Sequence, residues 1–463
     1  MEKTDVAKDP AVKKKGEDLE YAYDAVRVAN KFLESQLQKQ QAEWKDELED
    51  LRNQLSQKIC SGSSPAKKRF SFTFISLSAP TTETLCAARP KPAAVAGLLE
   101  CRKRDETKLL KNLITDLRSE GALALPPGLP ASVIFLCVRQ ADSSGDQARA
   151  RSLCSAALVA MKAALKKQTS DLDMTALWLK NSLDSDELVS MTTDLSDLTR
   201  SLSDLCIQAY QQLLSITETQ LQKLIVPALL ESETIAGLSG SAAKLVVSRK
   251  RAGSDPRPLG ADAPTMALVL RQLGALHTAL SRQALPQSLA EQAFRQMTYL
   301  ICASALNNLL LRKDMCCCSR GMQIRYNLSV LEEWLRSRGL AAGGAVATLE
   351  PLIQAAQLLQ VGKKTDADAQ AIVLTCTALS SKQIMKILTL YTPHSDLDEK
   401  VSLNFIRTVQ ELVKGRSDSQ PPQLLMDVRR AFPVTVPYSP TPALSADDLV
   451  IPDSLKISFL RRS

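Results

Sequence analysis

Three adjacent cysteines, Cys316, Cys317 and Cys318, are the residues in this chain whose type most readily suggests chemistry. Thiolates bind zinc, but zinc ligands usually come in pairs two to four residues apart, with a second pair elsewhere. Consecutive cysteines on a helix would point to different faces and could not all reach one metal ion. We therefore expect ordinary core or surface cysteines, no bound metal and no cofactor.

Residues for hydrolytic or phosphoryl chemistry are equally sparse. The sequence contains no Gly-x-x-x-x-Gly-Lys-Ser/Thr pattern, so it lacks the loop that cradles nucleotide phosphates. Its two histidines, His277 and His394, lie far apart and outside any His-Glu-x-x-His frame. Glu332 and Glu333 are adjacent carboxylates on a predicted helix, where charge or packing roles dominate. The sequence predicts no enzyme.

A basic triplet, Arg249-Lys250-Arg251, precedes Ser254 in the polar stretch 239–264. This arrangement is typical of sites for basophilic kinases, and a phosphate would add about two negative charges to a basic loop. The alternative is a solvated loop without modification. Ser254 is therefore a candidate phosphosite.

The composition favours an all-α protein, because Leu, Ala, Gln, Lys and Glu dominate while aromatic residues make up 4% and glycines number 17. The net charge of +8 is spread over short patches, which does not indicate nucleic-acid binding. No apolar run has the length of a transmembrane segment, and the N-terminus lacks the apolar core of a secretion signal. We expect a cytoplasmic protein whose 11 cysteines stay reduced.

Residues 17–59 have the pattern of a coiled coil. Apolar or tolerated residues recur at alternating steps of four and three up to Trp44, where two steps of four adjoin. Such a stutter is a local unwinding that coiled coils tolerate. No Gly or Pro interrupts the seam, so we predict dimerisation through this rod of roughly 60 Å. The alternative is a single long surface helix.

Residues 60–97 are rich in Ser, Thr, Pro and Ala, which predicts a flexible linker. From Leu98 the pattern becomes helical, and an amphipathic helix is expected from Leu98 to Leu117. Pro126, Pro127 and Pro130 predict a non-helical segment before the apolar run Val133–Val138. Further helices are expected at 151–167, 176–182, 194–230, 267–285 and 288–312.

The stretch from Val434 to Ser463 contains four prolines, which exclude a long helix. We expect this tail to run extended across the helical body. Its expected anchors are the apolar residues Leu449, Ile451, Leu455, Ile457 and Phe459.

The two most distinctive blocks, 306–336 and 349–372, each read as amphipathic helix. The first contains Gly-Met-Gln-Ile-Arg-Tyr-Asn at Gly321–Asn327 and Leu-Glu-Glu-Trp-Leu at Leu331–Leu335. These motifs closely resemble the dilute domain, the C-terminal part of the cargo-binding globular tail of class V myosins. The resemblance covers about 98–463 and extends to the coiled-coil arm.

The resemblance implies an elongated, two-subdomain helical globular tail. Subdomain I would span 98–285 and include the loop 239–264, and subdomain II would span 286–463 with an extended C-terminal strap. Between Trp178 and Tyr210 the chain is shorter than the family by roughly three dozen residues, so a core helix of subdomain I is missing or replaced. The adaptor sites of that subdomain therefore carry over poorly.

The resemblance also implies partners and the residues that contact them. Tyr326 and Gln360 match positions that bind a Rab GTPase of recycling endosomes, and the alternative is that Tyr326 only packs between helices. Lys313 and Lys386 match the lysines through which the tail folds back on its motor head and inhibits it. Here the alternative is two unrelated solvated lysines. Vesicle adaptor proteins are further implied partners.

The resulting prediction is a cargo-binding and autoregulatory tail that links vesicles or organelles to actin-based transport. The patterns of a motor head and of light-chain-binding motifs are not found, so we expect a tail-only product or a fragment. The alternative is a coiled-coil vesicle tether or scaffold without a motor. The Gly321–Leu335 pattern argues against it, because generic helical rods need not carry such a pattern.

Overall fold

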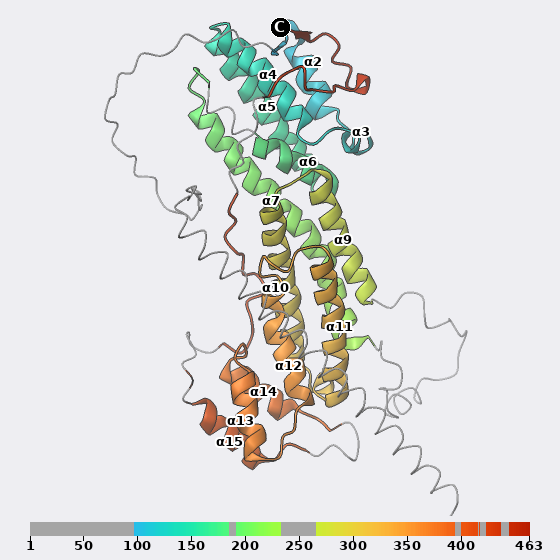
Figure 1. The fold of residues 1–463 in the computed structure, drawn as a ribbon, viewed down its shortest axis with the longest axis vertical. Coiled ribbons are helices and arrows are strands. Elements are labelled where there is room, and N and C mark those ends of the chain that lie inside the picture. The colour runs from blue at the N-terminus through green and yellow to red at the C-terminus, as the bar shows by residue number, and fades with distance from the viewer. Residues whose placement is uncertain are drawn as a thin grey trace, which may run out of the picture. The chain divides into compact units, whose positions relative to one another are not determined.

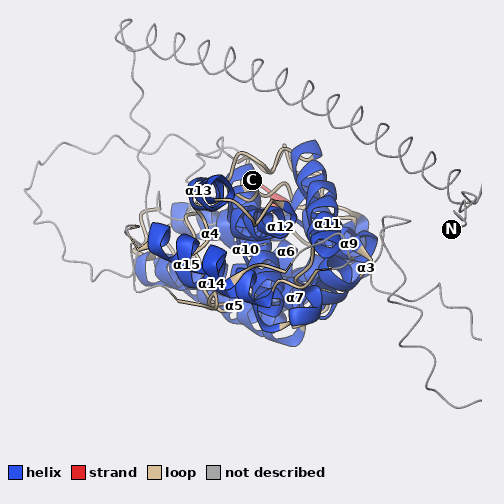
Figure 2. Cartoon of the chain, turned by 90° about the horizontal axis from the view of Figure 1, so that it is seen from below, coloured by secondary structure: helices blue, strands red, loops and turns tan. Residues whose placement is uncertain are grey.

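The computed structural model describes residues 97–184, 191–232, 265–393, 400–414, 416, 423–436 and 444–463. The predicted coiled coil at 17–59, the linker up to residue 96, Ser254 and His394 lie outside this part of the chain. All described residues belong to one compact unit, Phe70–Ser463. This part of the chain is almost entirely helical, which confirms the predicted all-α class (Figure 1, Figure 2).

The α-helices of the described residues are, in chain order, α2 (Glu106–Leu110), α3 (Ser119–Leu123), α4 (Leu129–Ser143), α5 (Gln147–Lys167), α6 (Leu172–Leu183), α7 (Ser196–Val226), α9 (Met266–Arg282), α10 (Gln287–Leu311), α11 (Cys318–Ser337), α12 (Glu350–Gln360), α13 (Asp366–Thr375), α14 (Ser381–Leu390) and α15 (Leu403–Val413). Short turns of 3-10 helix are η1 (Lys103–Asp105), η6 (Lys313–Met315), η7 (Ala347–Leu349) and η8 (Asp453–Leu455), and π-helical turns are η2 (Lys111–Thr115) and η4 (Pro227–Glu231). Two short strands, β1 (Leu99–Glu100) and β2 (Arg461–Arg462), pair antiparallel. None of these helices could cross a membrane.

Helix α7 connects the N-terminal helices to the rest of the body. It is 31 residues long and contacts α5 and α6 as well as α9 and α10 (Figure 1). Its buried residues are one, three or four positions apart, as a helix with one face in the core requires: Leu202, Leu205, Cys206, Ala209, Tyr210, Leu213, Ile216. Further along the chain α11 packs against α12, and α15 packs against α13 and α14.

Polar caps fix where several of these helices begin. The Asp146 carboxylate accepts a hydrogen bond from the backbone N–H of Arg149 and starts α5. Helix α14 begins with a capping box, in which the Ser380 hydroxyl and the Gln383 side chain each accept from the other's backbone N–H. Such caps satisfy backbone donors that have no partner inside the helix. Thr365 plays the same role for α13.

Two expectations about helix boundaries were wrong. Helix α4 begins at Leu129 and includes Pro130 in its first turn, because a proline there gives up an N–H that has no helical partner. The segment from Leu98 begins as strand and 3-10 turn, and α-helix starts only at Glu106. The four residues Leu109, Leu113, Ile114 and Leu117 are nevertheless buried, while Leu110 is half-buried.

The two distinctive blocks each contain a break that periodicity did not reveal. The first block divides between α10 and α11 at η6, and the second divides between α12 and α13 at Val361–Thr365. At the first break Cys316 and Cys317 precede α11, which begins at Cys318, so the expectation that the three cysteines share a helix was wrong. The helices themselves keep their apolar stripes on the core.

Asp142, near the end of α4, holds the short connection between α6 and α7. Its carboxylate accepts four hydrogen bonds of 2.5–2.9 Å from the backbone N–H groups and hydroxyls of Thr192 and Thr193. Burial acts to raise the pKa of Asp142, but these hydrogen bonds outweigh it and keep that pKa below its usual value. The connection thereby has a defined anchor on α4 where the sequence indicated a shortened stretch.

The C-terminal part of the chain is extended, and it lies on helices from distant parts of the sequence. Residues 423–436, here called the strap segment, lie on α10. Residues 444–463, the terminal segment, pair with β1 and lie on η2, where the Asn112 side chain donates to the Lys456 carbonyl at 3.1 Å. The predicted anchors pack against the core, with Leu455 and Ile457 buried and Leu449, Ile451 and Phe459 partly buried. This confirms the extended tail, although the structure shows that it begins before Val434.

Carboxamide side chains of α10 hold the backbone of the strap segment. The Gln296 side chain donates to the Arg430 carbonyl at 2.8 Å and accepts from the Phe432 N–H at 3.0 Å. Gln292 pairs in the same way with both backbone groups of Thr435, at 2.8 and 2.7 Å. Asn307 does so with Met426 at 2.9 and 2.8 Å, and the Tyr299 hydroxyl donates to the Asp427 carbonyl at 2.9 Å. The pairs run from Gln292 with Thr435 to Asn307 with Met426, so the strap segment runs antiparallel to α10.

Candidate binding surfaces

The first surface is the part of α11 and α12 that carries Tyr326 and Gln360. A Cβ atom on Gly321 would lie 2.7 Å from the Leu359 Cβ and 2.8 Å from the Ala356 carbonyl oxygen. Only glycine allows α11 and α12 to approach this closely. Gln360 is exposed at the end of α12 beside Gly321, and its amide donates to the Ala356 carbonyl at 3.0 Å.

Tyr326 is 48% exposed on the solvent side of α11. It lies about 140° around the helix from Gly321 and about 7.5 Å along its axis. The alternative that this tyrosine only packs between helices therefore does not fit its exposure. Tyr326 and Gln360 border the same helix pair, and none of the hydrogen bonds in the described part of the chain joins them.

Residues around Tyr326 and Gln360 add an apolar side chain and an ion pair. Val361 follows Gln360 and is 43% exposed. The Arg325 guanidinium lies 3.0 Å from the carboxylate of the buried Glu332, which explains the acidic residue at this position of the motif. Lys363 donates to the carbonyls of Leu359 and Val361 and caps the end of α12. Sequence reasoning did not single out Val361, because one valine after a helix carries no pattern.

The second surface contains Lys313 and Lys386, which are far apart in the sequence. Cys316 connects them, because its N–H donates to the Lys313 carbonyl at 3.2 Å and its carbonyl accepts from the Thr392 N–H, just beyond α14, at 2.7 Å. Burial raises the pKa of the Cys316 thiol to about 12, and the charge of Lys386 opposes that rise. The fold therefore places both lysines beside Cys316, with Lys313 exposed and Lys386 half-buried.

The charges next to Lys313 are mostly paired with one another. The Arg312 guanidinium contacts the carboxylates of Glu231 and Asp314, the latter at 2.8 Å. Hydrogen bonds to Asp314 and Glu231 raise the pKa of Arg312, and Arg312 in turn lowers that of Asp314. Lys313 itself has no ion pair among the described residues.

No metal centre was found among the described residues. Cys316 donates its thiol to the carbonyls of Leu309 and Arg312 at 3.4 and 3.5 Å, and Cys317 lies 3.2 Å from the Ser319 hydroxyl. Within the described ranges no three His, Cys, Asp or Glu side chains form a group that could hold a metal ion. The cysteines described here are packing residues.

Comparison with known proteins places these surfaces in a family. Residues 292–395, which contain Tyr326, Gln360, Lys313 and Lys386, match the DIL domain. Human unconventional myosin-Va is 46% identical over 390 residues, covering 79% of this chain and 20% of the relative. Human myosin-Vb is 43% identical over 385 residues, with 79% and 20% covered, and human myosin-Vc is 40% identical over 393 residues, with 80% and 22% covered.

The helical body of this chain belongs to the class V myosin tail family. The chain spans about a fifth of the length of the curated relatives it matches. The alignment to human myosin-Va is 390 residues long although 79% of 463 residues is about 366, so that relative has residues without a counterpart here. That these fall between Trp178 and Tyr210 stays a prediction.

Solved structures support the fold of this class V myosin tail. The structure described as "Myosin V cargo binding domain" superposes with a TM-score of 0.57 at 19% identity, covering 76% of this chain and 92% of that one. "Structure of Myo2-GTD in complex with Smy1" superposes equally well, covering 78% and 94%. At this identity the similarity establishes the helical tail fold. The family match also argues against the alternative of a coiled-coil vesicle tether or scaffold that is unrelated to myosins.

Proposed function

We propose that this chain acts as the cargo-binding and autoregulatory tail of a class V myosin. In this role it links vesicles or organelles to actin-based transport, in the cytoplasm, through Rab GTPases and adaptor proteins. The observation that carries the proposal is the exposure of Tyr326 on a DIL domain. An exposed tyrosine has a large apolar ring and one hydroxyl, and such residues are typical anchors of protein interfaces.

The first partner that we propose is a Rab GTPase of recycling endosomes. Tyr326 would insert its ring into the GTPase, while the exposed Gln360 would contribute a hydrogen bond from the adjacent helix. The support is the exposure of both side chains on neighbouring helices and the Val361 side chain next to them. A tyrosine that is 48% exposed on a folded helix can be buried by a partner without local unfolding.

The test compares binding of the full chain to this GTPase loaded with a non-hydrolysable GTP analogue or with GDP, by isothermal titration. Wild type should bind the GTP form, and Tyr326→Glu should weaken binding by about 30-fold or more, the loss of a hot-spot residue. Val450→Glu, which changes an apolar side chain 75% exposed on the terminal segment, is the matched control and should bind like wild type. Equal binding by Tyr326→Glu and wild type would refute the site, as would a collapsed thermal melt.

The other parts of the proposal are homodimerisation and autoregulation. The 4-3 seam of residues 17–59 supports a parallel dimer. If sedimentation equilibrium gave a monomer mass for the full chain as well as for residues 97–463, it would argue against this dimer. Lys313 and Lys386 support docking on an acidic surface of a class V motor head, because the fold places both beside Cys316. Ser254 remains a proposed phosphosite in a basic stretch. We propose no catalytic role.

A further inference from the structure

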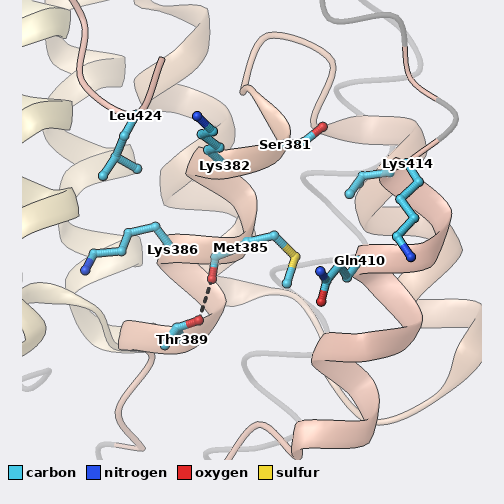
Figure 3. Close-up of a pocket in the computed structure, with 9 residues that line it drawn as sticks. Ser381, Lys382, Met385, Lys386, Thr389, Gln410, Lys414 and Leu424 are labelled. Atoms are coloured by element: carbon cyan, nitrogen blue, oxygen red, sulfur yellow. Dashed lines mark hydrogen bonds between the residues drawn. The ribbon is translucent and has the colours of Figure 1, made fainter. Parts of the chain in front are cut away.

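Helices α14 and α15 leave an open groove of about 510 Å³ between them. Its lining comes from one face of α14 (Ser381, Lys382, Met385, Lys386, Thr389), from the end of α15 (Gln410, Val413, Lys414) and from Leu424 of the strap segment. The α14 residues follow the spacing of a single helix face. In Figure 3 Met385 lies in the middle, with Gln410 and Lys414 on one side and Lys382, Lys386 and Leu424 on the other.

The groove has an apolar floor and a basic rim. Met385 and Leu424 are half-buried and Val413 is buried, so they form the floor. Lys382 and Lys414 are exposed at the rim and Lys386 is half-buried. None of the described residues that line the groove is acidic. The neighbouring carboxylate of Glu411 lies 2.6 Å from the Lys414 ammonium.

The arrangement of these lysines on α14 carries an electrostatic cost. Lys382 and Lys386 stand four residues apart on α14, where like charges destabilise a helix. Neither has an ion pair within the described ranges of the chain. A carboxylate brought by a partner would relieve this repulsion. The apolar floor would at the same time take up the partner's apolar side chains.

We propose that this groove docks an acidic amphipathic helix of an adaptor protein. Apolar side chains at steps of three and four would lie on Met385, Val413 and Leu424, and flanking Asp or Glu residues would pair with the three lysines. Amphipathic helices commonly bind in grooves of this kind through such anchors. The inference rests on the cargo-binding part of the proposed function. It adds the binding site and the preference of that site for acidic partners. Complementary charge selects the partner and speeds its association.

The probe for the test is a synthetic, fluorescein-labelled helical peptide with Leu at steps of three and four and Glu on both flanks. A control peptide carries Lys in place of every Glu. Fluorescence anisotropy with the full chain should show binding of the acidic peptide only. The binding should weaken between about 50 and about 300 mM salt, because salt screens exposed charges.

Variants of the chain locate the binding. Lys382→Glu combined with Lys414→Glu should weaken the acidic peptide about tenfold or more, since both rim charges are reversed. The matched control reverses two exposed lysines on other helices, Lys166→Glu with Lys223→Glu, and should bind within about twofold of wild type. Met385→Gln should weaken binding while leaving the thermal melt near that of wild type. Photo-crosslinks from the peptide should map to residues 381–389 and 410–414.

Several outcomes would overturn the proposal. Equal weakening by the rim and control double variants would show a non-specific charge effect, and crosslinks outside the two stretches would show another site. The rim variant retains Lys313 and Lys386, so it should still inhibit a tail-less class V motor. Suppose instead that the rim variant no longer inhibited the motor and that the peptide crosslinks lay outside residues 381–389 and 410–414. The groove would then bind the motor head and not an adaptor helix. If the acidic peptide did not bind while the full chain still bound the GTP-loaded Rab GTPase, the groove proposal would be refuted. The proposed function would then still stand.

Discussion

Several single side chains in this protein form hydrogen bonds with backbone groups from a distant part of the sequence. Asp142 accepts hydrogen bonds from Thr192 and Thr193, and Gln296 pairs with Arg430 and Phe432. In the sequence these side chains look like ordinary polar positions on helices. Their partners are 50 or more residues away, so periodicity could not reveal them. Tyr326 could be named from the motif, but its exposure became known only from the fold.

Replacing Asp142 with Asn tests the anchor between α4 and the start of α7. The amide keeps the shape and one accepting oxygen, but its NH₂ group cannot accept the hydrogen bond that the Thr192 N–H donates to the second carboxylate oxygen. We expect a loss of about 1–3 kcal/mol in the free energy of unfolding at neutral pH. Urea denaturation measures it, and Asp448→Asn, an exposed aspartate of the terminal segment, should stay within about 0.5 kcal/mol of wild type.

The same variant has a defined pH dependence. The folded pKa of Asp142 lies below its usual value, so the carboxylate contributes stability above the unfolded pKa of about 4. That contribution is lost as the pH falls through the folded pKa. The difference between wild type and Asp142→Asn should therefore be largest at neutral pH and shrink on acidification. A difference in the free energy of unfolding that has the same size at neutral and at acidic pH would contradict this explanation.

At the scale of elements, periodicity predicted that helices exist better than it predicted where they stop. The stretches around 151–167, 267–285 and 288–312 correspond closely to α5, α9 and α10. The breaks at η6 and after Gln360 were missed, because the apolar spacing continues across them. The prolines correctly predicted an extended tail. They could not show which helix it lies on, since the carboxamides of α10 resemble a solvated polar face.

Gly321 tests the close packing of α11 on α12. Gly321→Ala would place a methyl group 2.7 Å from the Leu359 Cβ and 2.8 Å from a backbone oxygen, so the helices must separate. We expect a loss of about 1–3 kcal/mol in the free energy of unfolding. Gly274→Ala in α9 is the matched control, because its nearest neighbour is the Trp334 side chain at 4.0 Å. This control should be neutral or gain about 0.5–1 kcal/mol, and similar effects of both variants would argue against tight packing at Gly321.

The carboxamides of α10 test how the strap segment is held. Gln292→Leu with Gln296→Leu removes the acceptors for the Thr435 and Phe432 N–H groups and the donors to two carbonyls. We expect faster amide hydrogen exchange across 423–436, because opening a segment that has lost its hydrogen bonds costs less free energy. Exchange in 444–463 should change little, since that segment is held by β1 and η2.

The control for the strap segment is Gln287→Leu on the same helix. Its side chain donates to the Gly339 carbonyl at 3.3 Å, which lies outside the strap segment. This variant should leave the exchange of 423–436 at the wild-type rate. Unchanged exchange of the Phe432 and Thr435 amides in the double variant would mean that packing, for example of Phe432 against Tyr299, holds the segment instead.

At the scale of the whole molecule, the fold brings together residues that no local pattern connects. Lys313 and Lys386 are separated by three α-helices in the sequence, and the contact between Cys316 and Thr392 helps to place them in one region. The groove lysines Lys382 and Lys414 come from two helices in the same way. In the sequence, the signal for this groove was the pair Lys382 and Lys386, two like charges four residues apart on one predicted helix. The class V myosin motif identified the domain, but the position of α15 beside α14 came from the structure.

The last prediction concerns inhibition of a motor by this chain in trans. Adding the full chain to a tail-less class V motor should lower the actin-activated ATPase at low salt, if Lys313 and Lys386 dock on an acidic surface of the head. Lys313→Ala with Lys386→Ala should abolish that inhibition, while Lys166→Ala with Lys223→Ala on other helices should not. Raising the salt should weaken inhibition by wild type, because exposed charges are screened within about 8 Å at physiological ionic strength. Equal inhibition by both double variants would refute a role of the two lysines, and no inhibition by wild type would leave this tail with cargo binding alone.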